Sequence, residues 1–105
     1  MKVQATKAMT SEINAYFKEN GIPYEAIYET MSPAAYRWEV DINAEQHEDD
    51  FLPATGKMRA IKISYPENFY ACPRYVTTRD LLKVFRKSDK TLGGFLHTLC
   101  GEIAV

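Results

Sequence analysis

Four side chains of this chain have the chemistry of a thiol–imidazole pair, in which a base activates a thiol as a nucleophile. They are Cys72, Cys100, His47 and His97. Nothing in the local sequence marks either cysteine as activated. Cys100 also falls beside the apolar side of an expected helix, where buried cysteines are usually inert. We therefore predict no catalytic residues and no cofactor, and two cysteines alone make no disulfide framework.

A run of acidic residues around His47 offers a second chemistry, the binding of a divalent metal ion. We call this run the acidic loop, and its residues are Asp41, Glu45, Glu48, Asp49 and Asp50. The run lacks the central glycine and the alternating oxygen ligands of an EF-hand. A zinc site would need His97 or a cysteine brought in by folding. We predict a solvated loop, with a metal site around His47 as the alternative.

Basic side chains gather between Thr77 and Lys90, in a pattern typical of an amphipathic helix. If that helix reaches Lys90, its cations fall within roughly 100° of arc, away from apolar residues such as Leu81 and Val84. Like charges one turn apart destabilise a helix slightly, which favours an anionic partner: a phosphate backbone, an acidic protein surface or the protein's own acidic loop. The alternative is a solvated helix face. The predicted partner-binding residues are Arg74, Arg79, Lys83, Arg86, Lys87 and Lys90.

Charge is divided unevenly along the chain, although the net charge is only −1. Residues 1–56 carry four basic and ten acidic residues, a net charge of −6. Residues 57–105 carry nine basic and four acidic residues, a net charge of +5. A fold that keeps the halves apart has an acidic and a basic region, whereas a fold that interleaves them has a neutral surface.

Hydrophobic periodicity predicts an α+β fold with an antiparallel three- or four-stranded meander. An N-terminal helix and two C-terminal helices are expected to pack on one face of that sheet. Thr6, Thr10 or Ser11 is expected to begin the first helix, and Asn20-Gly21-Ile22-Pro23 to end it. The remaining predicted elements are strands at 24–31, 36–43 and 58–65, a long connection at 45–57, an edge strand at 69–76, a helix that Thr77 caps, and a last helix at 92–103.

The strongest strand pattern lies at residues 36–43. Tyr36, Trp38 and Val40 alternate there with polar residues, as in an antiparallel strand with one covered face. The preceding Ser32-Pro33-Ala34-Ala35 has the composition of a turn. Residues 24–31 and 36–43 are therefore predicted to form a hairpin.

The length of 105 residues predicts a single domain, 1–105, and 46% hydrophobic with 26% charged residues excludes an unfolded chain. No stretch approaches the 18 or so consecutive apolar residues of a membrane span. The first residues lack the apolar run of a signal peptide. We therefore expect no membrane partner and a cytoplasmic location with free thiols.

In its small size, its lack of catalytic groups, its 12% aromatic content and its divided charge, the chain resembles small accessory proteins of phages and mobile elements, including the anti-CRISPR proteins. This resemblance is one of general character, and no functional residue is taken from it. It implies a non-catalytic inhibitor or adaptor that binds a protein or ribonucleoprotein. Direct nucleic-acid binding by the basic C-terminal helix is the second hypothesis, and metal binding around His47 is the third.

Overall fold

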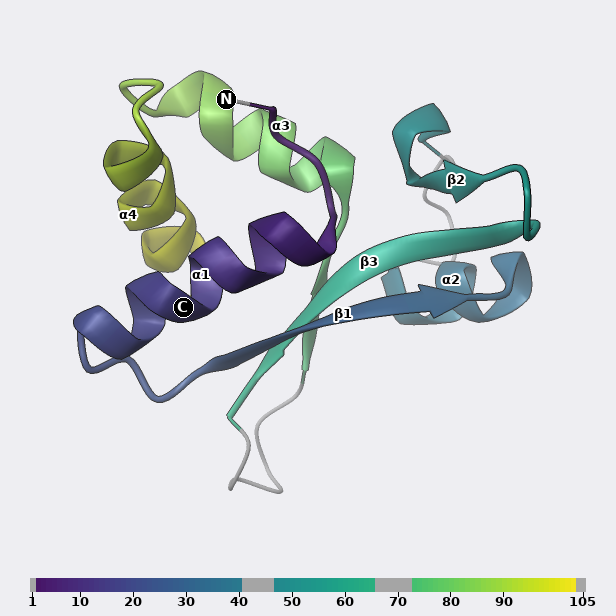
Figure 1. Ribbon diagram of the computed structural model, residues 1–105, viewed down its shortest axis with the longest axis horizontal. Coiled ribbons are helices and arrows are strands. Elements are labelled where there is room, and N and C mark those ends of the chain that lie inside the picture. Colours follow the sequence, from purple (N-terminus) through teal and green to yellow (C-terminus); the bar gives the residue numbers. More distant parts are fainter. Residues whose placement is uncertain (1, 41–46, 66–72, 104–105) are drawn as a thin grey trace.

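The computed structural model describes residues 2–40, 47–65 and 73–103 (Figure 1). This part of the chain confirms the predicted α+β class, with an N-terminal helix and two C-terminal helices around an antiparallel sheet. Its helices are α1 (Lys7–Glu19), α2 (Pro33–Val40), the single 3-10 turn η1 (Glu48–Asp50), α3 (Thr78–Lys87) and α4 (Leu92–Ile103). Its strands are β1 (Glu25–Met31), β2 (Phe51–Leu52), β3 (Lys57–Ser64) and β4 (Arg74–Val76).

Strand β3 is the centre of the sheet, with β1 along one edge and β2 and β4 along the other. Because side chains alternate along a strand, the four buried apolar residues of β3 divide between two faces. Ile61 and Ile63 belong to the main core, whereas Met58 and Ala60 belong to a smaller cluster on the opposite face. Helices α1, α3 and α4 contribute to the main core, and α2 contributes to the smaller one (Figure 1).

Helix α1 begins and ends as the sequence predicts. The hydroxyl of Thr6 accepts a hydrogen bond from the amide of Met9 at 3.1 Å, which satisfies one free donor of the first turn. After the helix, Gly21 has a φ of +62°, and the Ile22 amide donates to the Phe17 carbonyl at 2.8 Å. This is the Schellman ending that a glycine in the left-handed conformation permits.

The strand predicted at 36–43 is wrong for residues 36–40, which form the end of α2, while residues 41–43 lie outside the described residues. The Ser32 hydroxyl accepts from the Ala35 amide at 3.3 Å, and the Ser32 carbonyl accepts from the Tyr36 amide at 2.8 Å. Ser32 therefore caps a helix in which Pro33 takes the first position, where a proline loses no hydrogen bond. The helix buries Tyr36 but leaves Trp38 75% exposed, and β1 pairs with β3 instead of forming the predicted hairpin.

The predicted strand at 58–65 is confirmed as β3, and the one at 69–76 as β4 for its last three residues. Positions 69–72 of that strand lie outside the described residues. Within the connection at 45–57, described from residue 47 onward, η1 and β2 form, followed by a turn with Gly56 at a φ of +68°.

Helix α3 has the predicted capping box: the Thr77 hydroxyl accepts from the Asp80 amide, and the Asp80 carboxylate accepts from the Thr77 amide at 3.0 Å. The helix ends at Lys87 and does not reach Lys90, so the condition under which all the predicted cations fall on one arc is not met. Lys90 has a φ of +67°, which lies outside the helical region. The last helix is confirmed as α4.

Candidate functional site

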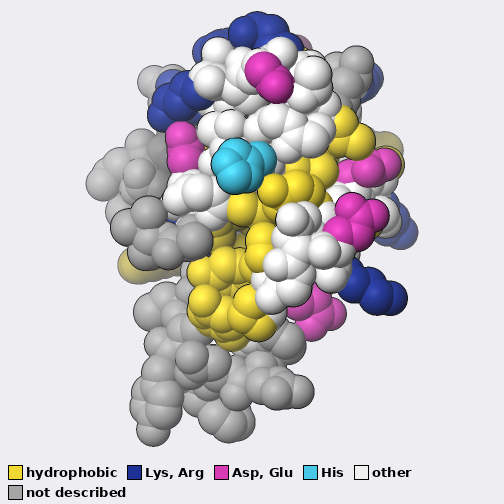
Figure 2. All heavy atoms as spheres, turned by 90° about the vertical axis from the view of Figure 1, so that its left-hand side faces the viewer, with side chains coloured by type: hydrophobic (Ala, Val, Ile, Leu, Met, Phe, Trp, Pro, Cys, Tyr) yellow, Lys and Arg dark blue, Asp and Glu magenta, His cyan; other side chains and the backbone are white. Residues whose placement is uncertain are grey.

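Helix α3 presents three basic side chains on the side that faces away from the core. Arg79, Lys83 and Arg86 fall opposite the buried Thr78, Leu81 and Val84 at 100° per residue, and all three are exposed. We call this side the basic face. Figure 2 shows Lys and Arg side chains gathered at the top of the molecule, where α3 lies in Figure 1.

The other three predicted partner-binding residues lie beside this face. Lys87 is on the last turn of α3, Arg74 is on β4, and Lys90 is in the connection to α4. Since the helix ends before Lys90, that residue does not continue the stripe, and its Nζ donates to the Arg86 carbonyl at 3.5 Å. The predicted group is therefore brought to one end of the molecule, but it spreads over three elements.

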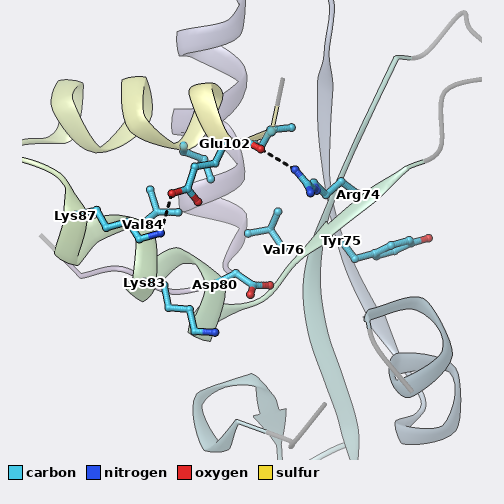
Figure 3. Close-up of a pocket in the computed structure, with 10 residues that line it drawn as sticks. Arg74, Tyr75, Val76, Asp80, Lys83, Val84, Lys87 and Glu102 are labelled. Carbon is cyan, nitrogen blue, oxygen red and sulfur yellow. Dashed lines mark hydrogen bonds and ion pairs between the residues drawn. The ribbon is translucent and has the colours of Figure 1, made fainter. Parts of the chain in front are cut away.

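The fold neutralises only part of this positive charge. Lys87 Nζ lies 3.2 Å from Glu102 Oε1, and Arg74 Nη1 donates to the Glu102 carbonyl at 2.7 Å (Figure 3). By contrast, no hydrogen bond or ion pair joins the side chain of Lys83 or Arg86 to another described residue. These two cations are available to a partner.

A pocket of about 260 Å³ lies beside the basic face, between β4, α3 and α4. Its apolar lining comes from Val76, Val84, Leu99 and Ile103. Its charged lining comes from Arg74, Lys83, Lys87, Asp80 and Glu102, of which Arg74 and Lys87 both point toward Glu102 (Figure 3).

Three cations and two carboxylates leave this lining with one excess positive charge. The carboxylate of Asp80 is already engaged by the Thr77 capping box, and that of Glu102 by Lys87. Because the Lys87–Glu102 pair is exposed, it is easily broken by a competing anion. The site can therefore hold a carboxylate or phosphate group over an apolar floor.

No ion pair joins the described members of the acidic loop to Lys83 or Arg86, and these members differ in their surroundings. Glu48 and Asp49 are exposed on η1, whereas Asp50 is fully buried. Asp50 Oδ1 accepts from the Thr78 amide at 3.0 Å, and its Oδ2 accepts from the Tyr36 hydroxyl at 3.3 Å. The predicted positions Asp41 and Glu45 lie outside the described residues.

Asp50 is a structural anchor, so the prediction of a solvated residue is wrong for this position. Its carboxylate lies at the N-terminus of α3, where the helix dipole favours negative charge. Burial raises the pKa of the Asp50 carboxyl, and the hydrogen bonds from Thr78 oppose that rise. Burial and the nearby Asp50 carboxylate raise the pKa of the Tyr36 hydroxyl, which therefore stays protonated and donates.

His47 caps η1, and its Nδ1 accepts from the Asp49 amide at 3.3 Å. The same Nδ1 lies 3.7 Å from Asp49 Oδ2, but it can form an ion pair there only when it is protonated and no longer accepts. Among the residues that the structure describes, no three His, Cys, Asp or Glu side chains are grouped to hold a metal ion. Metal binding around His47 stays a prediction, since two members of the acidic loop are not described.

The nucleophile candidates are not assembled into a pair in the described residues. Burial raises the pKa of the Cys100 thiol to about 11, which keeps it protonated at neutral pH. His97 is on the same helix, and its Nδ1 is 3.3 Å from the hydroxyl of Tyr16. Cys72 lies outside the described residues.

Sequence reasoning missed three features of the site. Glu102 lies fifteen positions beyond Lys87 in sequence, and only the packing of α4 on α3 brings the two side chains together. The burial of Asp50 has no local signal, because nothing in the sequence distinguishes it from the acidic Glu48 and Asp49 that precede it. The exposure of Trp38 did have a local signal, because Ser32 followed by Pro33 is typical of the start of a helix.

Comparison with known proteins finds no match: no family model, no curated protein and no solved structure is similar to this chain. The site must therefore be interpreted from its own geometry. No helix in the described part of the chain is long and apolar enough to cross a membrane.

Proposed function

We propose that this chain is a non-catalytic interaction module, a small inhibitor or adaptor whose basic face docks on an acidic surface of a protein or ribonucleoprotein. The observation that carries the proposal is the pair of exposed cations, Lys83 and Arg86, that have no partner among the described residues. A folded protein gains nothing from two such neighbours on one helix face, because like charges there are mildly repulsive. The pocket beside them gives the partner an anion-binding hollow with an apolar floor.

The exposed side chain of Trp38 favours a protein partner. A tryptophan that is 75% exposed is uncommon on a surface that binds nothing, and tryptophan is enriched at the energetic centres of protein interfaces. Trp38 lies on α2, on the opposite face of the sheet from α3. A partner of this kind would suit the inhibitor character that the resemblance to anti-CRISPR proteins implies, in a cytoplasmic setting.

Nucleic-acid binding is the second candidate, and the same basic face favours it. Phosphates of a backbone can be contacted by Lys83, Arg86 and Lys87 from a single helix. Nucleic-acid binding also has a characteristic dependence on salt. A phosphate backbone releases counterions in proportion to the contacts made, so affinity for nucleic acid falls steeply with salt.

The test compares two polyanions at about 50 mM salt, where charge contacts are strongest. Fluorescently labelled poly-L-glutamate represents an acidic protein surface, and mixed-sequence duplex DNA and RNA represent the alternative. We expect saturable binding of poly-glutamate that weakens at least tenfold, roughly the loss of two exposed charge contacts, in the double variant Lys83→Gln/Arg86→Gln. The matched control is Lys18→Gln/Lys57→Gln, which removes the same charge from α1 and the start of β3.

Each outcome bears on a different hypothesis. Equal binding by both double variants would show that only net charge matters and would remove the basic face as a site. Tighter binding to duplex DNA or RNA than to poly-glutamate, lost in Lys83→Gln/Arg86→Gln, would replace the protein partner by a nucleic acid. No binding to any of the three polyanions would contradict both candidates.

A further inference from the structure

The outer edge of β1 is partly closed by a side chain. In the described sheet, β1 pairs with β3 along one edge only. On the other edge, Asn14 of α1 donates its Nδ2 to the Ala26 carbonyl at 2.8 Å and accepts from the Ala26 amide at 2.8 Å through Oδ1. An amide that takes both backbone groups of one residue occupies the place of a neighbouring strand. The N–H and C=O of Ala26 therefore point away from β3.

This contact fixes the direction of the remaining backbone groups of β1. In an antiparallel strand, groups that point to the same edge recur at every second residue, so those of Tyr28 and Thr30 also point outward. No hydrogen bond joins these outward groups to another described residue. The strand has no proline and a continuous register with β3, so neither a proline nor a bulge protects the edge.

The side chains along this edge favour a basic occupant. Glu25, Ile27 and Glu29 point to the same face of the sheet, and Ile27 is 41% exposed between the two carboxylates. Lys62, which lies opposite Ile27 on β3, balances only one of these charges. A second copy of β1 would bring like charges together, whereas alternating basic and apolar side chains would complement the edge.

We propose that β1 is a docking edge for an extended, basic polypeptide segment, which adds a strand beside Tyr28 and Thr30 and stops at Asn14. The main-chain groups of the two residues supply the hydrogen bonds, and Glu25 and Glu29 select the charge. This site lies on a different element from the basic face and does not depend on the function proposed for α3.

The probe is a short synthetic peptide in which lysine alternates with threonine or valine. Its control is the same peptide with alternate backbone amides N-methylated, which keeps every charge but removes the donors that face β1. We expect the unmodified peptide to bind and to slow hydrogen exchange at the amides of Tyr28 and Thr30 selectively. Binding of both peptides with equal affinity would overturn the proposal, because it would then rest on charge alone.

The matched protein variants are Thr30→Pro and Thr30→Val. Proline removes an amide that faces away from β3 and so leaves the sheet intact, which is why edge strands tolerate it. We expect affinity for the peptide to fall about tenfold or more in Thr30→Pro and to stay unchanged in Thr30→Val. If Thr30→Pro does not fold, the N-methylated peptide alone decides. The proposal would also be overturned if the wild-type chain associates with itself in the absence of peptide and Thr30→Pro abolishes that association. A second copy of the chain would then be the partner that pairs with the edge of β1.

Discussion

Charged side chains lie in opposite surroundings at the N-terminus of α3 and on its outer side. At the N-terminus of the helix, the carboxylate of Asp50 is fully buried and bonded to Thr78 and Tyr36. On the outer side, Lys83 and Arg86 are exposed and bonded to no described residue. The difference teaches that Asp50 stabilises the fold, whereas Lys83 and Arg86 remain available to a partner. Substitutions at the two places should therefore separate effects on stability from effects on binding.

The largest expected effect on stability is that of Asp50→Ala. It leaves the Thr78 amide and the Tyr36 hydroxyl buried without a partner, so we expect a loss of about 3 kcal/mol in the free energy of unfolding. The exposed neighbour provides the control, because Asp49→Ala should cost less than about 0.5 kcal/mol. Urea denaturation measures both. Equal losses in the two variants would remove the distinction between the buried and the exposed carboxylate.

A partly buried polar contact extends the comparison to the sheet. Asn14→Ala removes both hydrogen bonds to the backbone of the buried Ala26, and we expect a loss of about 2 kcal/mol in the free energy of unfolding. Ser11→Ala is the control, since the Ser11 hydroxyl bonds only to a carbonyl within its own exposed helix turn. A loss in Asn14→Ala no larger than that in Ser11→Ala would show that water replaces the amide at the edge of β1.

A third contrast lies at the start of α4, where two adjacent glycines differ in the room available for a side chain. A Cβ on Gly94 would clash with the Asp89 carboxylate, whereas one on Gly93 would meet nothing within 4 Å. The Asp89 carboxylate is held there by the Thr91 amide at 2.9 Å and the Thr91 hydroxyl at 2.6 Å. We expect Gly94→Ala to cost about 1 kcal/mol and Gly93→Ala to be neutral or slightly stabilising in urea denaturation.

A smaller effect should appear with pH at Asp50. Because the pKa of the Asp50 carboxyl is higher in the folded chain than in the unfolded chain, the unfolded chain loses the Asp50 proton first as the pH rises. The stability that the raised pKa of Asp50 contributes is fully present below the ordinary pKa of 3.8. It is lost as the pH passes through the higher pKa of the folded state. The stability of the wild type relative to Asp50→Asn should therefore fall as the pH rises from below 3.8 towards neutrality, as urea denaturation would measure. A relative stability that rises over this range would reverse the sign of the shift.

Much of the fold could be predicted from sequence because its signals are local. The Thr6 cap, the ending at Gly21 and the capping box of Thr77 with Asp80 each depend on residues within one turn of one another. Alternation also found β1 and β3. It failed at Tyr36 and Trp38, because period-two spacing over a few residues cannot exclude a short helix, and the start signal at Ser32 lay before the pattern.

The candidate site could be predicted only in part. Helical spacing identified Lys83 and Arg86 as neighbours on an outer face, and the structure places them so. Which cations are already paired depends on contacts far apart in sequence, such as Lys87 with Glu102. The burial of Asp50 likewise depends on Tyr36 of α2 and the Thr78 amide of α3 both reaching its carboxylate, which no local pattern reveals.

The most direct test of the account is a urea denaturation series on the wild type and on Lys83→Gln/Arg86→Gln, each with and without poly-L-glutamate. Without poly-glutamate, the double variant should be as stable as the wild type within about 0.5 kcal/mol, because neither exposed side chain forms a hydrogen bond or ion pair with a described residue. With poly-glutamate at about 100 times its dissociation constant, the wild type should gain roughly 2.7 kcal/mol, and the double variant should gain far less. A double variant that is destabilised without ligand, or that gains as much as the wild type with it, would contradict the claim that this face is kept for a partner.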